Sequence, residues 1–169
     1  MKRQRGVYVV EFAIIGTLLF VLLLGVIEMG RLYFTVNTLS ESVRRGARLA
    51  AVCDPTQQVE VQRILRRAIF NEVGDSGASN LIAGLETADL SLVYLDAGGS
   101  PVSSPSDLSG SDGFQAIRHV QLRVDNFIFN LLIPVHGGQI TLPGFRATLP
   151  RESLGRHAEE GVFPEITPC

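Results

Sequence analysis

One carboxylate interrupts the most apolar stretch of the chain. Glu11 stands five positions after Gly6, and no other charged residue occurs from Val7 to Ile27. On insertion scales a carboxylate at the centre of a bilayer costs about 2.5 to 3.5 kcal/mol, so an acidic residue within a span calls for a functional explanation. The alternative is that Glu11 lies near the membrane interface and compensates the positive end of the helix dipole. The residue pattern leaves both roles open.

The other residues capable of chemistry do not form a catalytic set. His119, His136 and His157 have no metal-ligand spacing to one another or to a cysteine. Glu159-Glu160 is interpreted as a charged tail rather than an acid/base pair. The two cysteines have no further ligands beside them, so they do not make a zinc site. The sequence therefore predicts no enzyme activity, no metal and no cofactor.

The two cysteines are Cys53 and Cys169, the last residue of the sequence. In an oxidising compartment such a pair is usually bridged. Closing so long a loop contributes about 4 to 5 kcal/mol in the entropy model. We therefore expect a Cys53–Cys169 disulfide; the alternatives are two free thiols or a bond between subunits.

The segment around Glu11 is long enough to cross a membrane. Val7 to Ile27 is 21 residues, which as a helix spans about 31 Å, and a hydrocarbon core is about 30 Å thick. A removable secretory signal would have a shorter apolar region followed by small residues. Lys2, Arg3 and Arg5 precede the span, which places the N-terminus in the cytoplasm and the rest of the chain outside it. An uncleaved signal anchor would satisfy the same observations.

The helix is expected to continue beyond the membrane to Val52, a length of about 69 Å from Val7. Asp54-Pro55 is the predicted stop, because the residue before proline avoids helical angles. Glu41 and Arg45 have the spacing of a helical ion pair. Apolar or small residues recur at spacings of three and four along one face, which is expected to pack on the remaining chain: Met29, Leu32, Val36, Leu39, Val43, Gly46 and Ala50.

Four ordered motifs on this helix resemble a known family. They are Arg5-Gly6, Val10-Glu11-Phe12-Ala13, Gly25 to Arg31, and Arg44-Arg45-Gly46-Ala47-Arg48. A short basic leader, a glycine and a glutamate at the fifth following position are also the layout of type IV prepilins. The set is similar to the TadE-like family, the minor pilins of tight-adherence (Tad, type IVc) pili, over about residues 5 to 52.

The resemblance implies processing and partners. A prepilin peptidase, a dedicated membrane aspartic peptidase, would cut between Gly6 and Val7, and the Glu11 carboxylate would meet the free amine of Val7 in its own or a neighbouring subunit. Further partners would be other minor pilins, the major pilin, the inner-membrane assembly platform and the lipid bilayer. Removing residues 1–6 changes the formal net charge from −2 to −5, so there is no electrostatic case for binding nucleic acid.

The expected organisation is a leader at 1–6, a transmembrane helix at 7–28, its extracytoplasmic continuation at 29–52 and an α+β domain at 53–169. Within that domain we expect an amphipathic helix at Val59–Val73 whose arginines, Arg63, Arg66 and Arg67, form a solvated face rather than a binding patch. The order of helices and strands predicts a small antiparallel sheet on the outer half of the long helix.

The strands are predicted at 89–96, 116–125 and 139–149, with a break at Pro143-Gly144. Residues 127–133 are either a strand or a short buried helix. Residues 97–113 are rich in Gly, Ser, Pro and Asp, and composition favours disorder over a contact loop.

Two functions remain open. The first is a minor pilin or pseudopilin that takes part in assembly of a Tad pilus for adhesion, located in the inner membrane as a single-pass protein or incorporated in the pilus. The second is a membrane-anchored periplasmic binding or scaffold protein that is not a pilin.

Overall fold

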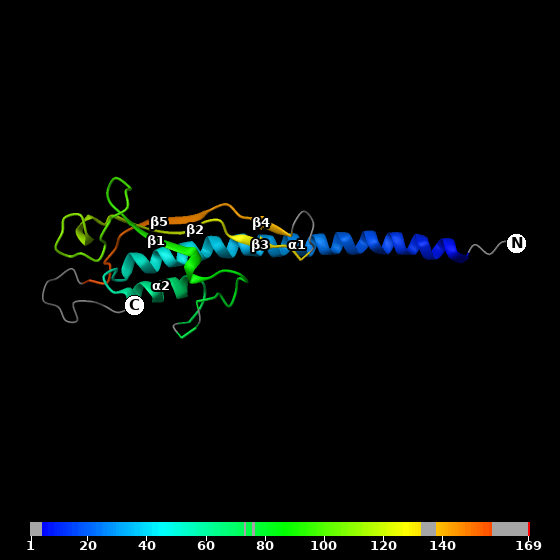
Figure 1. Ribbon diagram of the computed structural model, residues 1–169, viewed down its shortest axis with the longest axis horizontal. Helices are drawn as coiled ribbons and strands as arrows, with labels where there is room; N and C mark the ends of the chain where they lie inside the picture. Colours follow the sequence, from blue (N-terminus) through cyan, green and yellow to red (C-terminus); the bar gives the residue numbers. More distant parts are fainter. Residues whose placement is uncertain (1–4, 73, 76, 133–137, 157–168) are drawn as a thin grey trace.

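A single long helix forms the axis of the molecule. In the computed structural model the described residues are 5–72, 74–75, 77–132, 138–156 and 169, and the side chains of residues 5 and 6 are not described. Helix α1 runs from Arg5 to Val52, which corresponds to about 72 Å. Its N-terminal half projects alone, and the other elements surround its C-terminal half (Figure 1). The fold is α+β, as predicted.

The end of α1 is closed by the chain that follows the last strand. The Ala51 carbonyl accepts hydrogen bonds from the N–H groups of Glu152 (3.1 Å) and Leu154 (3.3 Å). Carbonyl groups in the last turn of a helix lack partners within the helix, so this segment supplies them. The Asp54 carboxylate accepts a bond from the Thr56 N–H at 2.8 Å, which fixes the turn at the predicted stop.

Helix α2, Gln58–Ala68, ends five residues before the predicted Val73. The reason is Phe70, which has a φ of 65°. The N–H of Phe70 donates to the Arg67 carbonyl (3.2 Å), and the N–H of Asn71 donates to the Arg66 carbonyl (3.0 Å). This is the Schellman arrangement, in which glycine is usual at the left-handed position. A phenylalanine there gave no signal in the sequence.

Two antiparallel sheets follow. The first has the order β1-β2-β5, from strands β1 (Leu90–Leu95), β2 (His119–Val124) and β5 (Phe145–Pro150). The second pairs β3 (Ile128–Asn130) with β4 (Gln139–Thr141). Short 3-10 turns at Thr87–Asp89 and Phe114–Ala116 precede β1 and β2. Residues 127–133 therefore contain a strand, and the predicted break at Pro143-Gly144 separates strands of different sheets.

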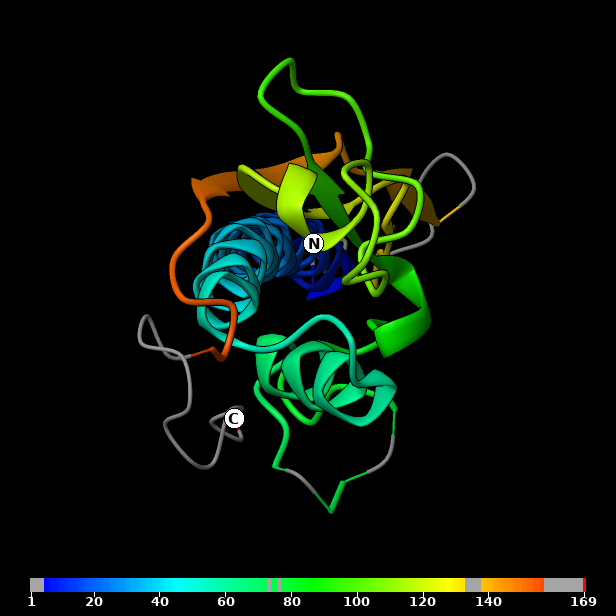
Figure 2. The same ribbon diagram turned by 90° about the vertical axis from the view of Figure 1, so that its left-hand side faces the viewer.

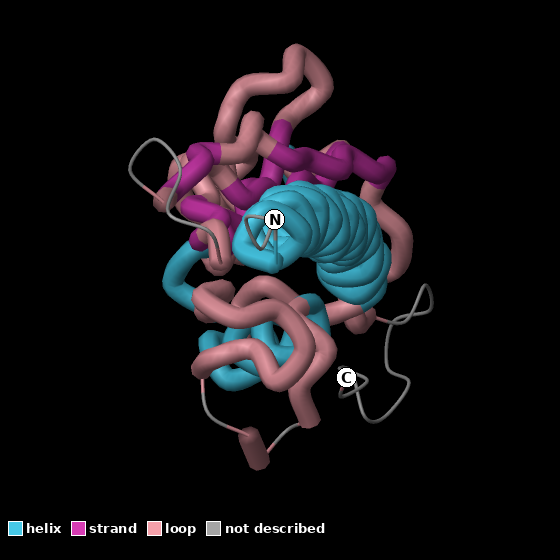
Figure 3. The backbone as a smooth tube through the Cα atoms, turned by 90° about the vertical axis from the view of Figure 1, so that its right-hand side faces the viewer, coloured by secondary structure: helices cyan, strands magenta, loops and turns pink. Residues whose placement is uncertain are grey.

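The first sheet covers one side of the outer half of α1, and α2 lies on the other side (Figures 2 and 3). The register places Leu92 opposite Leu122, and Leu122 opposite Ala147. Leu122 is fully buried. The main core joins α1, α2 and both sheets through Leu39, Val43, Ala47, Leu65, Ala68, Ile69, Leu122, Val124, Phe127 and Phe129. The predicted placement of the sheet on the long helix is confirmed.

The loop at 97–113 consists of defined turns, in contrast to the disorder favoured from composition. Backbone bonds tie it to itself and to β1, such as Val102 N–H to the Tyr94 carbonyl at 2.8 Å. The Asp96 carboxylate accepts from the N–H groups of Gly98 and Ser100. Hydrogen bonds from the hydroxyl and N–H of Ser109 lower the pKa of the exposed Asp107 below its ordinary value. Local side-chain acceptors of this kind stabilise turns.

Candidate assembly surface of the long helix

The inner half of α1 packs against no other described element. Its most apolar window has a mean hydropathy of 2.6 and is 0% buried inside the fold. By length and composition, α1 is the one helix in the described part of the chain that could span a membrane. The Thr17 hydroxyl donates to the Ala13 carbonyl at 2.8 Å. That bond satisfies the hydroxyl inside the helix, which hydrocarbon surroundings require.

The predicted processing and assembly residues all lie on this free segment. Gly6 and Val7 are in the first turns of α1, and the Val7 side chain is 55% exposed. Glu11 is exposed, and none of the described residues hydrogen-bonds to its carboxylate or forms an ion pair with it. In the uncut chain the Val7 nitrogen belongs to a peptide bond, so a free amine for Glu11 would arise only after cleavage. The cleavage site and the role of Glu11 stay predictions.

The outer half of α1 buries the predicted stripe except at its start. Leu39, Val43 and Ala50 are at most 2% exposed, whereas Met29 is 63% exposed. The prediction for Met29 was wrong because Glu28, one residue earlier, faces the domain and is only 9% exposed. The face that docks is therefore rotated at its membrane-proximal end, where a polar contact replaces the apolar one.

Glu28 joins the long helix to the hairpin of β3 and β4. One carboxylate oxygen accepts the Leu132 N–H at 2.9 Å, and the other pairs with the Arg31 guanidinium at 2.9 Å. Arg31 also lies over the Phe129 ring, 5.2 Å from its centroid. Sequence reasoning placed Glu28 at the end of the apolar stretch and within the Gly25 to Arg31 motif, but predicted no contact for its side chain. The Glu28–Arg31 spacing of i,i+3 was the available signal for an ion pair.

Gly46 marks the closest approach of three elements. A Cβ atom at this position would overlap the Leu122 side chain and lie 2.8 Å from the Ala68 Cβ atom. The small residues at the end of the stripe therefore allow both β2 and α2 to pack closely against α1. Arg45, beside Gly46, lies over the Phe70 ring at 5.4 Å. It does not pair with Glu41 within the described part of the chain, so the expected ion pair is replaced by a cation–π contact.

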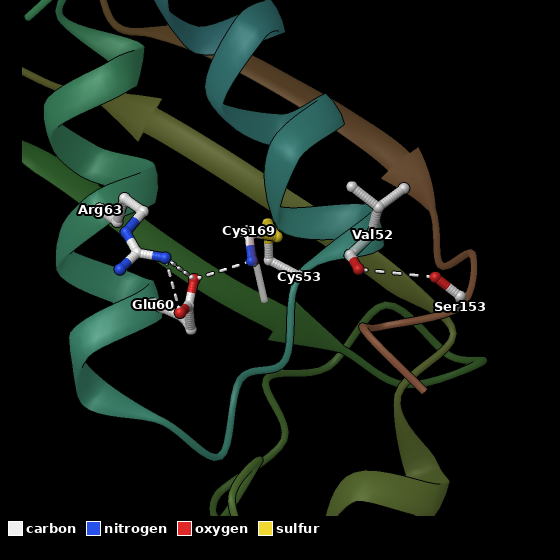
Figure 4. The surroundings of a disulfide bond; sticks show 6 residues. All are labelled: Val52, Cys53, Glu60, Arg63, Ser153 and Cys169. Carbon is white, nitrogen blue, oxygen red and sulfur yellow. Dashed lines mark hydrogen bonds and ion pairs between the residues drawn. A yellow bond between two sulfur atoms is a disulfide. The ribbon is translucent and has the colours of Figure 1, made fainter. Parts of the chain in front are cut away.

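A disulfide closes the far end of the helix. Cys53 and Cys169 are bonded, with their Cα atoms 5.8 Å apart. The Cys169 N–H donates to the Glu60 carboxylate at 3.2 Å, and Glu60 pairs with Arg63 at 2.8 Å. Figure 4 shows this cluster beside the weaker contact of Ser153 with the Val52 carbonyl. The sequence contained no indication of the role of Glu60 on α2. Arg63, which was expected on a solvated face, forms an ion pair with the Glu60 carboxylate.

Two buried polar groups lie next to this disulfide. The Asp54 side chain is fully buried and pairs with Arg156 at 3.3 Å. The Tyr94 hydroxyl has no hydrogen-bond partner among the described residues. Burial, with the charge of Asp54 as a second cause, raises the pKa of Tyr94 well above its ordinary value. A neutral phenol is therefore strongly favoured in the folded chain.

Of the three histidines, His119 is the one within the residues that the structure describes. His119 begins β2, and its Nδ1 atom is 3.4 Å from the Asp96 carbonyl oxygen. His136, His157 and the predicted tail Glu159-Glu160 lie outside the described residues. Within the described ranges, no group of three or more His, Cys, Asp or Glu side chains could hold a metal ion.

These observations define an α+β protein. Among the residues described, it has one helix that could span a membrane, and the outer half of that helix forms part of the core of the domain. The sequence model of the TadE-like protein family matches residues 6–48, nearly all of α1. The resemblance found in the motifs is thereby confirmed for this segment, which carries the TadE-like signature. No curated protein and no solved structure gave a significant match.

Proposed function

We propose that this protein is a minor pilin or pseudopilin that takes part in assembling a Tad (type IVc) pilus for adhesion. The observation that supports it best is that the family match covers a single helix whose two halves differ: one is apolar and unburied, and the other packs against the domain. Residues 6–48 match the TadE-like family, and within them an unburied apolar half precedes a half that carries the domain. A pilin needs both, because its helix must reside first in the membrane and then among other subunits.

In this proposal the chain inserts once in the inner membrane, with residues 1–6 in the cytoplasm and the domain outside it. A prepilin peptidase then cuts between Gly6 and Val7. The partners are other minor pilins, the major pilin and the inner-membrane assembly platform. The exposed inner half of α1 is the surface that would exchange lipid for these partners.

The first experiment tests cleavage. Intact mass of the full-length chain, expressed with and without the peptidase, should show loss of residues 1–6 only when the peptidase is present. Gly6→Leu should abolish the cut, because a bulky residue replaces the small one at the junction. Gly16→Leu is the matched control: no atom lies within 4 Å of a Cβ at that position, so cleavage should be normal. A mature protein that still begins at Met1 in piliated cells would favour the membrane-anchored scaffold.

The second experiment tests Glu11. After cleavage its carboxylate would pair with the Val7 amine, and an ion pair in low dielectric offsets part of the desolvation of both groups. Glu11→Ala should insert in the membrane normally yet be missing from sheared pili. Glu41→Ala removes an exposed carboxylate from the outer half of α1 and should be incorporated. Wild-type amounts of Glu11→Ala in pili would refute the assembly role.

A further inference from the structure

Exposed apolar side chains gather where the domain meets the inner half of α1. Tyr33, Phe34, Leu81 and Leu132, here called the base, are between 48% and 73% exposed. They come from α1, the loop after α2 and the segment that follows β3. Phe34 and Leu81 line one small cavity together with Arg31 and Phe129, so these segments share a surface. Among the described residues at the far end of the domain, Val59 and Leu108 are also exposed.

The contact between Glu28 and Leu132 fixes the level of the base along the helix. Glu28 is the first charged residue after the apolar stretch Val7–Ile27, and the Leu132 N–H is held 2.9 Å from its carboxylate. The segment just after β3 therefore lies near the point where α1 would leave the hydrocarbon core. Tyr33 is only five residues further along, which is about 7.5 Å of helix.

The spacing of two tyrosines gives a second, independent estimate of this level, about 5 Å deeper than the first. Tyr8 and Tyr33 are 25 residues apart, or about 38 Å along the helix. A bilayer with its headgroup regions is about 40 to 45 Å thick, and tyrosines are enriched at both of its interfaces. With the two tyrosines equally far from the midplane of the bilayer, Glu28 lies about 11 Å from that plane, within about 4 Å of the edge of a hydrocarbon core about 30 Å thick.

The protein contacts at Glu28 suit this depth. A carboxylate at the edge of hydrocarbon needs compensation, and Glu28 has both the Arg31 guanidinium and the Leu132 N–H. The side chain is nevertheless almost fully buried by protein. The exposed atoms at this level are instead the apolar ones of Leu132, which is 62% exposed.

We propose that the base rests in the headgroup layer of the bilayer that α1 spans, held there by the Glu28–Leu132 contact. The occupant is the lipid surface, because the base is continuous with the lipid-facing half of the same helix and lies at its exit. The inference rests on the membrane insertion included in the proposed function. It gives Glu28 the role of a positioning residue that sets how closely the domain sits on the membrane.

The chain contains no tryptophan, so single tryptophans can report depth. The full-length chain with Leu132→Trp is reconstituted in phosphatidylcholine nanodiscs that contain lipids brominated near the top or near the end of the acyl chains. Two matched variants accompany it: Leu19→Trp in the inner half of α1, and Leu108→Trp in the loop at the far end of the domain. These leucines are 52% and 46% exposed.

Leu132→Trp should lose emission with shallow bromines more than with deep ones. Leu19→Trp should be quenched by deep bromines, and Leu108→Trp should keep its emission with both. If Leu132→Trp behaves like Leu108→Trp while Leu19→Trp is quenched, the proposed lipid contact is refuted. A blue shift of Leu132→Trp without quenching would mean that protein covers the base, which also refutes it.

A second pair of variants tests the anchor. In the Leu132→Trp background, Glu28→Ala should reduce the shallow quenching because the Leu132 N–H loses its acceptor. Glu28→Gln retains an acceptor oxygen and should keep more of the shallow quenching than Glu28→Ala does. Glu41→Ala should leave the shallow quenching unchanged. Unchanged quenching in Glu28→Ala would refute the positioning role. Failure of Leu19→Trp to be quenched overturns membrane insertion itself, whereas absence of the chain from pili with Leu19→Trp quenched overturns only the pilin role.

Discussion

The two halves of α1 have the same backbone conformation but different packing constraints. A Cβ atom added at Gly16, Gly25 or Gly30 would have nothing within 4 Å, whereas the same atom at Gly46 would overlap Leu122. A span in lipid would require the inner half only to be apolar and helical, and its described side chains meet no packing partner in the fold. The outer half must fit β2 and α2, so shape decides its residues. Apolar composition thus constrains the residues of the inner half, whereas the fit to neighbouring elements constrains those of the outer half.

The largest expected effect concerns the clamp at the end of the outer half. Cys53→Ser should lower the free energy of unfolding of the domain by about 5 kcal/mol in the entropy model, because the bond closes a sequence separation of 116 residues. The measurement is the urea unfolding curve of the detergent-solubilised chain, in which protease cleavage near Asp54 reports the unfolded fraction. Cys169→Ser and the double variant should match it, because each breaks the same bond.

The control for this prediction is thiol labelling of denatured, unreduced wild-type protein, which should find no free cysteine. Full labelling at both positions would contradict the bond. Dimers on a non-reducing gel would place it between subunits.

The next effect compares a leucine from each environment. Leu122→Ala should destabilise the domain by about 2 to 5 kcal/mol, because a fully buried leucine leaves a cavity. Leu19→Ala, in the inner half, should leave unfolding of the domain unchanged. The two denaturation midpoints measured in the same detergent check the contrast. A similar loss in both variants would show that the inner half also supports the domain, and would end the distinction.

A third comparison uses two glycines of the same helix. Gly46→Ala should cost about 1 to 3 kcal/mol through overpacking, since the Ala68 Cβ atom is 2.8 Å from the added carbon. Gly30→Ala has open space and should be neutral or stabilise by roughly 0.5 to 1 kcal/mol, because glycine is a poor helix former. Thermal unfolding of both variants measures the difference. Equal stability would mean that α1 and β2 can separate without loss.

Sequence reasoning succeeded where one-dimensional patterns carry the information. The apolar run and the Asp54-Pro55 stop predicted α1, and the strand expected at 116–125 contains β2. These features depend on neighbours along the chain. The same holds for the motifs that matched the TadE-like family, because they lie on one continuous helix.

It failed where partners are distant or unusual. The left-handed Phe70 ended α2 early, and the burial of Glu28 depends on Leu132, 104 positions away. Glu60 is buried because it meets Arg63 and the N–H of Cys169. No local pattern distinguishes such a carboxylate from a solvated one. The predicted burial of Met29 was wrong because the side chain that faces the domain there is Glu28, whose partner Leu132 is distant in sequence.

The smallest expected effect tests how tightly the outer half is packed at Tyr94, which shares a core with Ala50 and Cys53. Its hydroxyl has no partner in the described part of the chain, so Tyr94→Phe should stabilise the domain by about 1 kcal/mol. Tyr33→Phe, at a 73% exposed position, should change nothing. Urea unfolding at neutral pH measures both.

The same substitution should alter the alkaline limit of stability. The pKa of Tyr94 is raised in the folded chain, so its contribution is complete below the unfolded value of about 10 and is lost as pH rises through the folded pKa. Wild-type stability should therefore fall above about pH 10, and Tyr94→Phe should lose less over that range because it cannot ionise. If Tyr94→Phe were instead less stable at neutral pH, the hydroxyl would have a partner that the fold as described lacks.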